Sequence, residues 1–156
     1  MSALLRLGMW VPILDGDPEA NRTYMQHYSS ERSRERREER GTQQFGGPGE
    51  RILLSTPDRK ALFGWRRQKY RKDEQRGVEC FIFSNRSRCL SSRLIREADR
   101  IADERWPGDR HFTFVNAEKT TARRDKDSLP GQCFIYAGWR PWGLSAGGLH
   151  ILERLQ

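Results

Sequence analysis

The 156-residue sequence has little or nothing of several features that define whole classes of protein. It has no run of about 18 apolar residues, so neither a transmembrane helix nor a membrane partner is expected. Its three cysteines are odd in number, lie far apart and form no CxxC pair. This argues against a disulfide scaffold and a structural zinc site and favours a reducing compartment, the cytoplasm. Residues 1–14 contain Arg6 and Pro12, and we do not expect them to form a signal peptide.

Hydrophobic residues are also scarce, at 35%, whereas charged residues make up 32%. Five Trp, seven Phe and four Tyr still supply large apolar side chains for a core. We expect a single domain over residues 1–156, with a charged, Gly-rich insertion at residues 29–50. Within it, residues 31–40 hold five Arg and four Glu, so their charges nearly cancel. This run fits a solvated helix extension or a mobile loop, and a phosphate-touching arm is an alternative.

The net charge of +8 and the pI near 9.9 favour an anionic partner such as nucleic acid. The densest positive run is residues 65–72, with five cations and two aromatics. Cations suit phosphates and aromatics suit bases, although a charged hairpin tip that meets only solvent has the same composition. The predicted nucleic-acid contacts are Arg66, Arg67, Lys69, Tyr70, Arg71, Lys72 and Lys119. The arginines of residues 86–96 extend this patch if the strand end and the helix start lie beside it, and Arg123-Arg124 is a weaker candidate.

Apolar spacing predicts an alternation of strands and helices along the chain. A strand lies within residues 4–14, and a helix starts at Asp17-Pro18. Three strands at residues 51–55, 61–65 and 78–83 form an antiparallel meander. A helix capped by Ser91 or Ser92 then ends at Trp106. Beyond it come a strand (111–115), a polar loop (116–130), a short helix (131–137) and two strands (139–144 and 149–154). This order predicts an α/β (α+β) domain with a mixed, mostly antiparallel central sheet flanked by helices.

Two motifs make this order resemble the GNAT acyltransferase fold. Residues 134–139, Phe-Ile-Tyr-Ala-Gly-Trp, have the form that is common on the last helix and strand of GNAT proteins. Arg86, Cys89 and Ser91 fit the frame of the GNAT loop R/Q-x-x-G-x-G/A, whose backbone N–H groups bind the pyrophosphate of coenzyme A. Both glycines are replaced here, so acetyl-CoA is a doubtful cofactor and the cofactor stays unknown. The tyrosine that often serves as general acid in GNAT enzymes falls at Phe134.

An ordered set of short segments is similar to phage Mom-type DNA modification proteins, a divergent group with a GNAT-like fold. The segments are 27–29 (His-Tyr-Ser), 46–50 (Gly-Gly-Pro-Gly-Glu), 61–65 (Ala-Leu-Phe-Gly-Trp), 105–108 (Arg-Trp-Pro-Gly), 130–139, 147–149 and 151–153. The resemblance implies modification of adenine in double-stranded DNA, which protects phage DNA from restriction enzymes in the host cytoplasm. An adenine inside a duplex is hard to reach, so base flipping is expected.

Four residues are the candidates for the chemistry. His27 and Tyr28 can transfer protons, or His27 can bind a metal, although Tyr28 also fits an apolar helix face. Asn116 follows an aromatic strand, where it can pair with an adenine edge or simply form a turn. Tyr136 can stack on a base, act as an acid, or pack. No spacing supports a metal site, and the other histidines, His111 and His150, are expected to be structural.

Three functions follow from these motifs. The first is an enzyme that modifies adenine in double-stranded DNA. The second is a coenzyme A-dependent acyltransferase acting on a small amine or a protein, which needs the impaired pyrophosphate loop. The third is a DNA-binding protein without enzymatic activity that has kept the fold. A homodimer is left open in each case.

Overall fold

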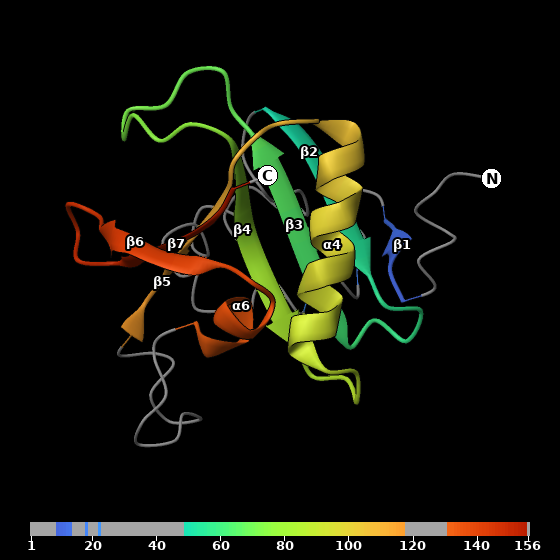
Figure 1. Cartoon of the computed structure of the whole chain (residues 1–156). Coiled ribbons are helices and arrows are strands. Elements are labelled where there is room, and N and C mark those ends of the chain that lie inside the picture. The colour runs from blue at the N-terminus through green and yellow to red at the C-terminus, as the bar shows by residue number, and fades with distance from the viewer. Residues whose placement is uncertain (1–8, 14–17, 19–21, 23–48, 118–130, 156) are drawn as a thin grey trace.

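The computed structural model describes residues 9–13, 18, 22, 49–117 and 131–155 (Figure 1). Most of the predicted helix from Asp17, of the 29–50 insertion and of the 116–130 loop lies outside these residues. Of that helix, Pro18 and Arg22 are described, and both are helical. The labelled strands are β1 (Val11–Pro12), β2 (Glu50–Ser55), β3 (Ala61–Arg67), β4 (Val78–Asn85), β5 (His111–Val115), β6 (Arg140–Leu144) and β7 (His150–Arg154). The labelled helices are α4 (Ser91–Arg105) and α6 (Gln132–Tyr136).

The strands form one seven-stranded sheet in the order β1-β2-β3-β4-β5-β7-β6. The pairs β2–β3 and β3–β4 are antiparallel, which confirms the predicted meander. The pair β4–β5 is parallel, because α4 returns the chain to the edge from which β4 started. The predicted mixed, mostly antiparallel sheet is therefore confirmed. In the strand predicted within residues 4–14, the described part contains only the short β1.

Helix α4 covers one face of the sheet. The apolar residues whose spacing predicts this helix are all buried: Leu94, Ile95, Ala98, Ile101 and Ala102. Its start differs from the prediction, since neither Ser91 nor Ser92 caps it. The N-cap is Leu90, in extended conformation and without a side-chain cap. Ser91 is already the first helical residue, and its Oγ accepts a hydrogen bond from Nδ2 of Asn85, 2.8 Å away. The helix ends as predicted at Trp106, whose N–H donates to the carbonyl of Ala102.

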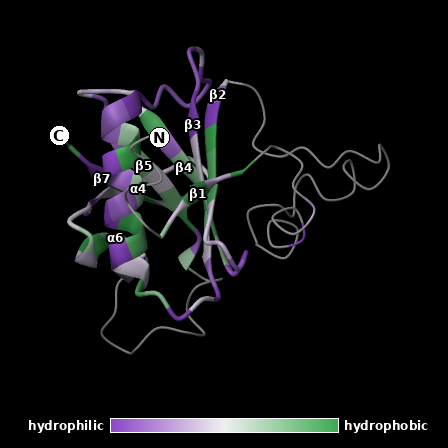
Figure 2. Ribbon diagram, turned by 90° about the vertical axis from the view of Figure 1, so that its right-hand side faces the viewer, coloured by the Kyte–Doolittle hydropathy of each residue, from purple (hydrophilic) through white to green (hydrophobic). Residues whose placement is uncertain are grey.

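The main core lies between α4 and the sheet and is rich in tryptophan. The indole nitrogens of Trp10 and Trp65 donate to the carbonyls of Leu94 and Ala98, at 2.7 and 2.9 Å. These bonds satisfy the polar atoms of large side chains that are fully buried. A smaller cluster of Leu53, Leu62 and Ile82 lies apart from the main core. Figure 2 shows hydrophobic residues along the strands and hydrophilic ones at the β2–β3 end that leads into the β3–β4 connection.

No helix within the described ranges is long and apolar enough to cross a membrane.

Candidate nucleic-acid interface

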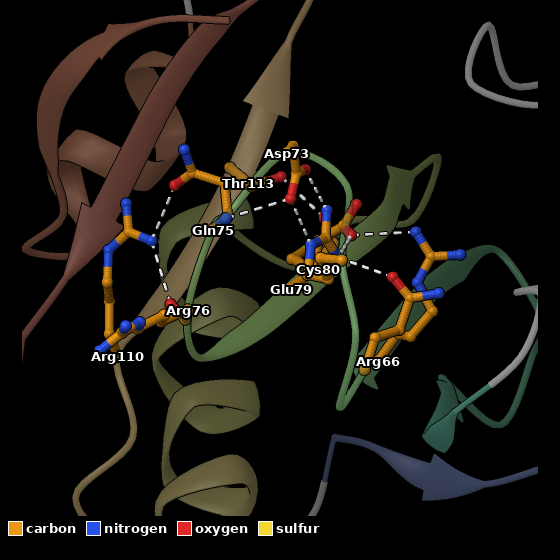
Figure 3. A network of polar contacts seen from close by, with 10 residues as sticks. Arg66, Asp73, Gln75, Arg76, Glu79, Cys80, Arg110 and Thr113 are labelled. Atoms are coloured by element: carbon orange, nitrogen blue, oxygen red, sulfur yellow. Dashed lines mark hydrogen bonds and ion pairs between the residues drawn. The ribbon is translucent and has the colours of Figure 1, made fainter.

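The parallel strands β4 and β5 separate part of the way along the sheet. They pair only over Val78–Cys80, opposite His111–Thr113, and the hydroxyl of Thr113 donates to the carbonyl of Cys80 at 2.8 Å where the pairing stops (Figure 3). The register between β3 and β4 also shifts there, so that Phe81 has no partner residue on β3. Beyond this point β4 follows β3 and β5 follows β7. We call the end where β4 and β5 finish the splayed end.

Helix α6 packs between the separated strands. Phe134 meets Phe83 of β4 edge-to-face, with ring centroids 5.9 Å apart, and it meets Trp139 at 4.8 Å. The helix begins at Gly131, whose φ of 72° lies in the left-handed region. A Cβ there would come within 2.3 Å of the side chain of Leu152, so only glycine fits without rearrangement. The phenyl ring of Phe134 is thus part of the core.

Asn116 and Tyr136, two of the four predicted site residues, lie at the splayed end. Asn116 follows the last residue of β5 and is half-buried. Tyr136 ends α6, with 66% of its surface exposed. The structure therefore brings an amide and a phenol to the same end of the sheet. His27, Tyr28 and Lys119 lie outside the described residues, as do Arg123 and Arg124.

The loop between β4 and α4 is held by its own side chains. Asn85 Nδ2 donates to the carbonyl of Cys89 and to Ser91 Oγ, both at 2.8 Å. Asn85 Oδ1 accepts from the N–H and the hydroxyl of Ser87, and Ser87 Oγ accepts from the N–H of Cys89. Two backbone N–H groups of the loop are therefore already hydrogen-bonded. A loop that binds pyrophosphate through its backbone needs such groups for its ligand.

The same loop and the start of α4 carry only positive charge. Between Glu79 and Glu97 the sequence has four arginines and no acidic residue. We call Arg86, Arg88, Arg93 and Arg96 the arginine cluster, and all four are exposed. Arg96 also donates to the carbonyl of Tyr136 at 2.7 Å, which joins α4 to α6, and Figure 1 shows these two helices side by side. Exposed guanidinium groups suit contact with phosphates.

Leu90 is a residue of this surface that the sequence reasoning missed. Its side chain is 71% exposed, between Arg88 and Arg93 in sequence. Spacing alone misleads here, because Leu90 precedes Leu94 by four residues and so appears to share its buried helix face. The extended conformation at the N-cap turns Leu90 away from that face.

The run at residues 66–72 lies at the opposite end of the sheet. It opens the connection from β3 to β4, whereas the arginine cluster follows the far end of β4 (Figure 1). Eight residues of β4 separate the two, or about 25 Å at about 3.3 Å per residue. The two groups therefore do not form one patch, and the condition for extending the first with the second is not met.

Three of the cations in this run are held by acids of the protein, and Figure 3 shows Arg66 beside Glu79. Arg66 and Arg71 both pair with Glu79, and Arg71 also pairs with Asp73. Arg67 pairs with Asp109 at 2.9 Å and with Glu50 at 3.5 Å. Their first role is thus to fasten the connection to the sheet.

The charge balance of this end differs from that of the arginine cluster. The hydrogen bond from Arg71 lowers the pKa of the Asp73 carboxyl, so the pair stays charged at neutral pH. Lys69, Lys72 and Tyr70 remain exposed beside a groove of about 1350 Å³. The groove is lined by residues of both signs, including Lys69, Arg76, Glu50 and Glu74.

His111 is buried in a network that holds the core together. Its Nδ1 lies 2.8 Å from Asp99 Oδ1, and Trp139 Nε1 donates to the other oxygen of Asp99 at 2.9 Å. Burial raises the pKa of the Asp99 carboxyl, and the hydrogen bond from His111 offsets only part of that rise. The imidazole is fully buried between Trp65 and Trp139, as the expected structural role requires. His150 begins β7 and pairs with Val115.

Within the described ranges, no group of three or more His, Cys, Asp and Glu side chains is arranged to hold a metal ion. All three cysteines have free thiols.

No protein-family model, curated protein or solved structure matches the chain. Its function is therefore inferred from the sequence motifs and from the geometry of the splayed end.

Proposed function

We propose that this protein modifies adenine bases in double-stranded DNA, on a GNAT-like fold, in the cytoplasm. The topology supports the GNAT-like part of the proposal. A single parallel pair, β4–β5, is joined by a helix, antiparallel strands flank it, and β7 lies between β5 and β6. The resemblance to Mom-type proteins supplies the substrate and the kind of reaction.

The arginine cluster at the splayed end is the observation that carries the DNA part. Four exposed guanidinium groups lie along the β4–α4 loop and the first turns of α4, and no acidic residue lies between Glu79 and Glu97. Arginine side chains reach outward and bind phosphates of a polymer, whereas a coenzyme A pyrophosphate needs backbone N–H groups. At Ser87 and Cys89 those N–H groups are hydrogen-bonded within the loop. This favours DNA over the coenzyme A-dependent acyltransferase.

The chemistry assigned to this end is transfer of a group to the exocyclic amine of adenine. The adenine leaves the base stack, and the amide of Asn116 pairs with its edge. The amino nitrogen forms a bond to the transferred group as the bond between that group and its donor breaks. The donor leaves with that electron pair, and the nitrogen gives up one proton. His27 and Tyr28 are the proposed proton acceptors, and Tyr136 is the described hydroxyl at this end.

The test is to express the protein together with a plasmid and to analyse the plasmid nucleosides by mass spectrometry. We expect a heavier deoxyadenosine and resistance to several restriction enzymes that cut at adenine-containing sites. The double variant Arg88→Gln, Arg93→Gln should lose most of the modification. Its matched control is Lys69→Gln, Lys72→Gln, which removes the same charge from the opposite end and should lose less.

Three results would overturn parts of this proposal. If the protein folds and binds DNA but the plasmid nucleosides are unmodified, the result would favour the third function, a DNA-binding protein without enzymatic activity. A clear rise in melting temperature with acetyl-CoA would restore the acyltransferase. A larger loss in the Lys69 and Lys72 variant would move the DNA contact to the β3–β4 connection.

A further inference from the structure

Two apolar side chains stand exposed at the splayed end. Leu90 is 71% exposed and Tyr136 is 66% exposed. Single exposed hydrophobic residues are common on protein surfaces and need no explanation by themselves. These two differ in their surroundings, because they accompany the four exposed guanidinium groups of the arginine cluster.

The backbone that carries Leu90 is fixed on both sides. The carbonyl of Cys89 and the hydroxyl of Ser91 both accept hydrogen bonds from Asn85. The carbonyl of Leu90 itself accepts from the N–H groups of Arg93 and Leu94, both at 3.1 Å. A side chain that enters another molecule needs a rigid backbone beneath it, and these hydrogen bonds hold the backbone of Leu90 in place.

Tyr136 is held at the same end by a second connection. Arg96 donates to its carbonyl at 2.7 Å, and α6 is anchored beneath it by Phe134. The backbone that carries the phenol ring is therefore held in place, while the ring itself is exposed. Aromatic side chains of this kind stack on nucleic-acid bases.

We propose that Leu90 is a wedge that enters the base stack of a DNA duplex, and that Tyr136 stacks on a base displaced by it. This rests on the proposed function, and it names how the duplex is opened for that reaction. The arginine cluster holds the phosphates on either side of the opened step. Apolar side chains that enter between base pairs and unstack them are a general device of DNA-bending proteins, and basic residues accompany them.

The experiment compares Leu90→Ala with the wild-type full-length protein on three DNA substrates. The first is a matched duplex, the second has the target adenine opposite an abasic site, and the third is a matched duplex with 2-aminopurine next to the target. Unstacking costs energy only in matched DNA, so the variant should modify the first about tenfold to a hundredfold more slowly. It should modify the second at the wild-type rate. Binding of the wild type should raise the 2-aminopurine fluorescence, and the variant should not.

Two further variants serve as controls. Leu144→Ala removes a leucine of similar exposure, 61%, from β6 and should behave as the wild type on all three substrates. Leu90→Met keeps an apolar side chain of similar size and should retain opening. Tyr136→Ala should lower the 2-aminopurine signal, and Tyr136→Phe should restore it, because stacking needs the ring and not the hydroxyl.

The outcomes separate the wedge from the proposed function. An equal loss by Leu90→Ala on matched and abasic substrates would overturn the wedge, as would wild-type binding without a 2-aminopurine signal. Opening of the duplex without any modified adenine would overturn the proposed function and leave the wedge standing. Absence of DNA binding by the wild type would overturn both.

Discussion

Asn85 is the residue on which the shape of the β4–α4 loop depends most. Its amide takes part in four hydrogen bonds, at 2.6 to 2.9 Å, with Ser87, Cys89 and Ser91. We predict that Asn85→Ala lowers the free energy of unfolding by about 2 kcal/mol. Four bonds at about 1 kcal/mol each set the upper limit, and water replaces part of them because the loop is half-buried.

For a chain of this size, about 2 kcal/mol corresponds to a melting temperature lower by about 4–8 °C. Thermal or urea unfolding followed by circular dichroism measures the change. The control is Ser92→Ala, because within the described residues the hydroxyl of Ser92 makes no hydrogen bond of its own. A loss below about 0.5 kcal/mol for Asn85→Ala would refute the role assigned to the amide.

A second substitution at the same position separates loop shape from charge. Asn85→Asp keeps the oxygen that accepts from Ser87 and loses the donor to the carbonyl of Cys89. It also places a carboxylate beside the arginine cluster. We expect it to be less destabilising than Asn85→Ala and yet to weaken DNA binding at low salt. Equal DNA affinity in both variants would remove the cluster from the interface.

Two further predictions concern residues that hold the sheet ends. Burial alone would raise the pKa of Glu153, but hydrogen bonds from Arg110 and Arg140 outweigh it and hold that pKa below its ordinary value of 4.5. Glu153→Gln should therefore cost about 2–3 kcal/mol at pH 7, and denaturation at a series of pH values should show this difference shrinking as the pH falls below about 4.5. Gly131→Ala should cost about 2–3 kcal/mol in urea unfolding, since its Cβ meets Leu152 in the left-handed region. Its control, Gly108→Ala, has open space around the new Cβ at a similar φ and should cost about 1 kcal/mol; equal losses would mean that the contact with Leu152 is unimportant.

Helix α4 shows both the reach and the limit of the sequence pattern. Its apolar spacing located the helix and its buried face, because burial against the sheet is what that spacing produces. The predicted cap at Ser91 or Ser92 is wrong, because the N-cap is Leu90. The hydroxyl of Ser91 accepts a hydrogen bond from Asn85 of the preceding strand. Whether a serine caps a helix depends on its hydrogen-bond partners in the folded protein, and local sequence does not reveal those partners.

For the short helix and the strand boundaries too, local sequence predicts the positions of the elements, whereas tertiary contacts decide the details. The strands β2, β3 and β4 were located within a few residues from their β-branched and aromatic content. The separation of β4 from β5 was not predictable in detail. It depends on the register shift at Phe81 and on the packing of Phe134 against Phe83, and both are tertiary.

The two basic segments show that the density of cations does not reveal which cations the fold itself uses. Residues 66–72 have more cations, yet Arg66, Arg67 and Arg71 meet carboxylates from Glu50, Glu79 and Asp109, which lie elsewhere in the sequence. The segment around residues 86–96 has fewer cations and contains no acidic residue, although Glu97 directly follows Arg96. A buried or half-buried arginine must be paired, and so the fold uses the cations nearest its acids. The arginine cluster, by contrast, is exposed and its segment contains no acidic residue, which is why the proposed DNA contact is assigned to it and not to the segment with more cations.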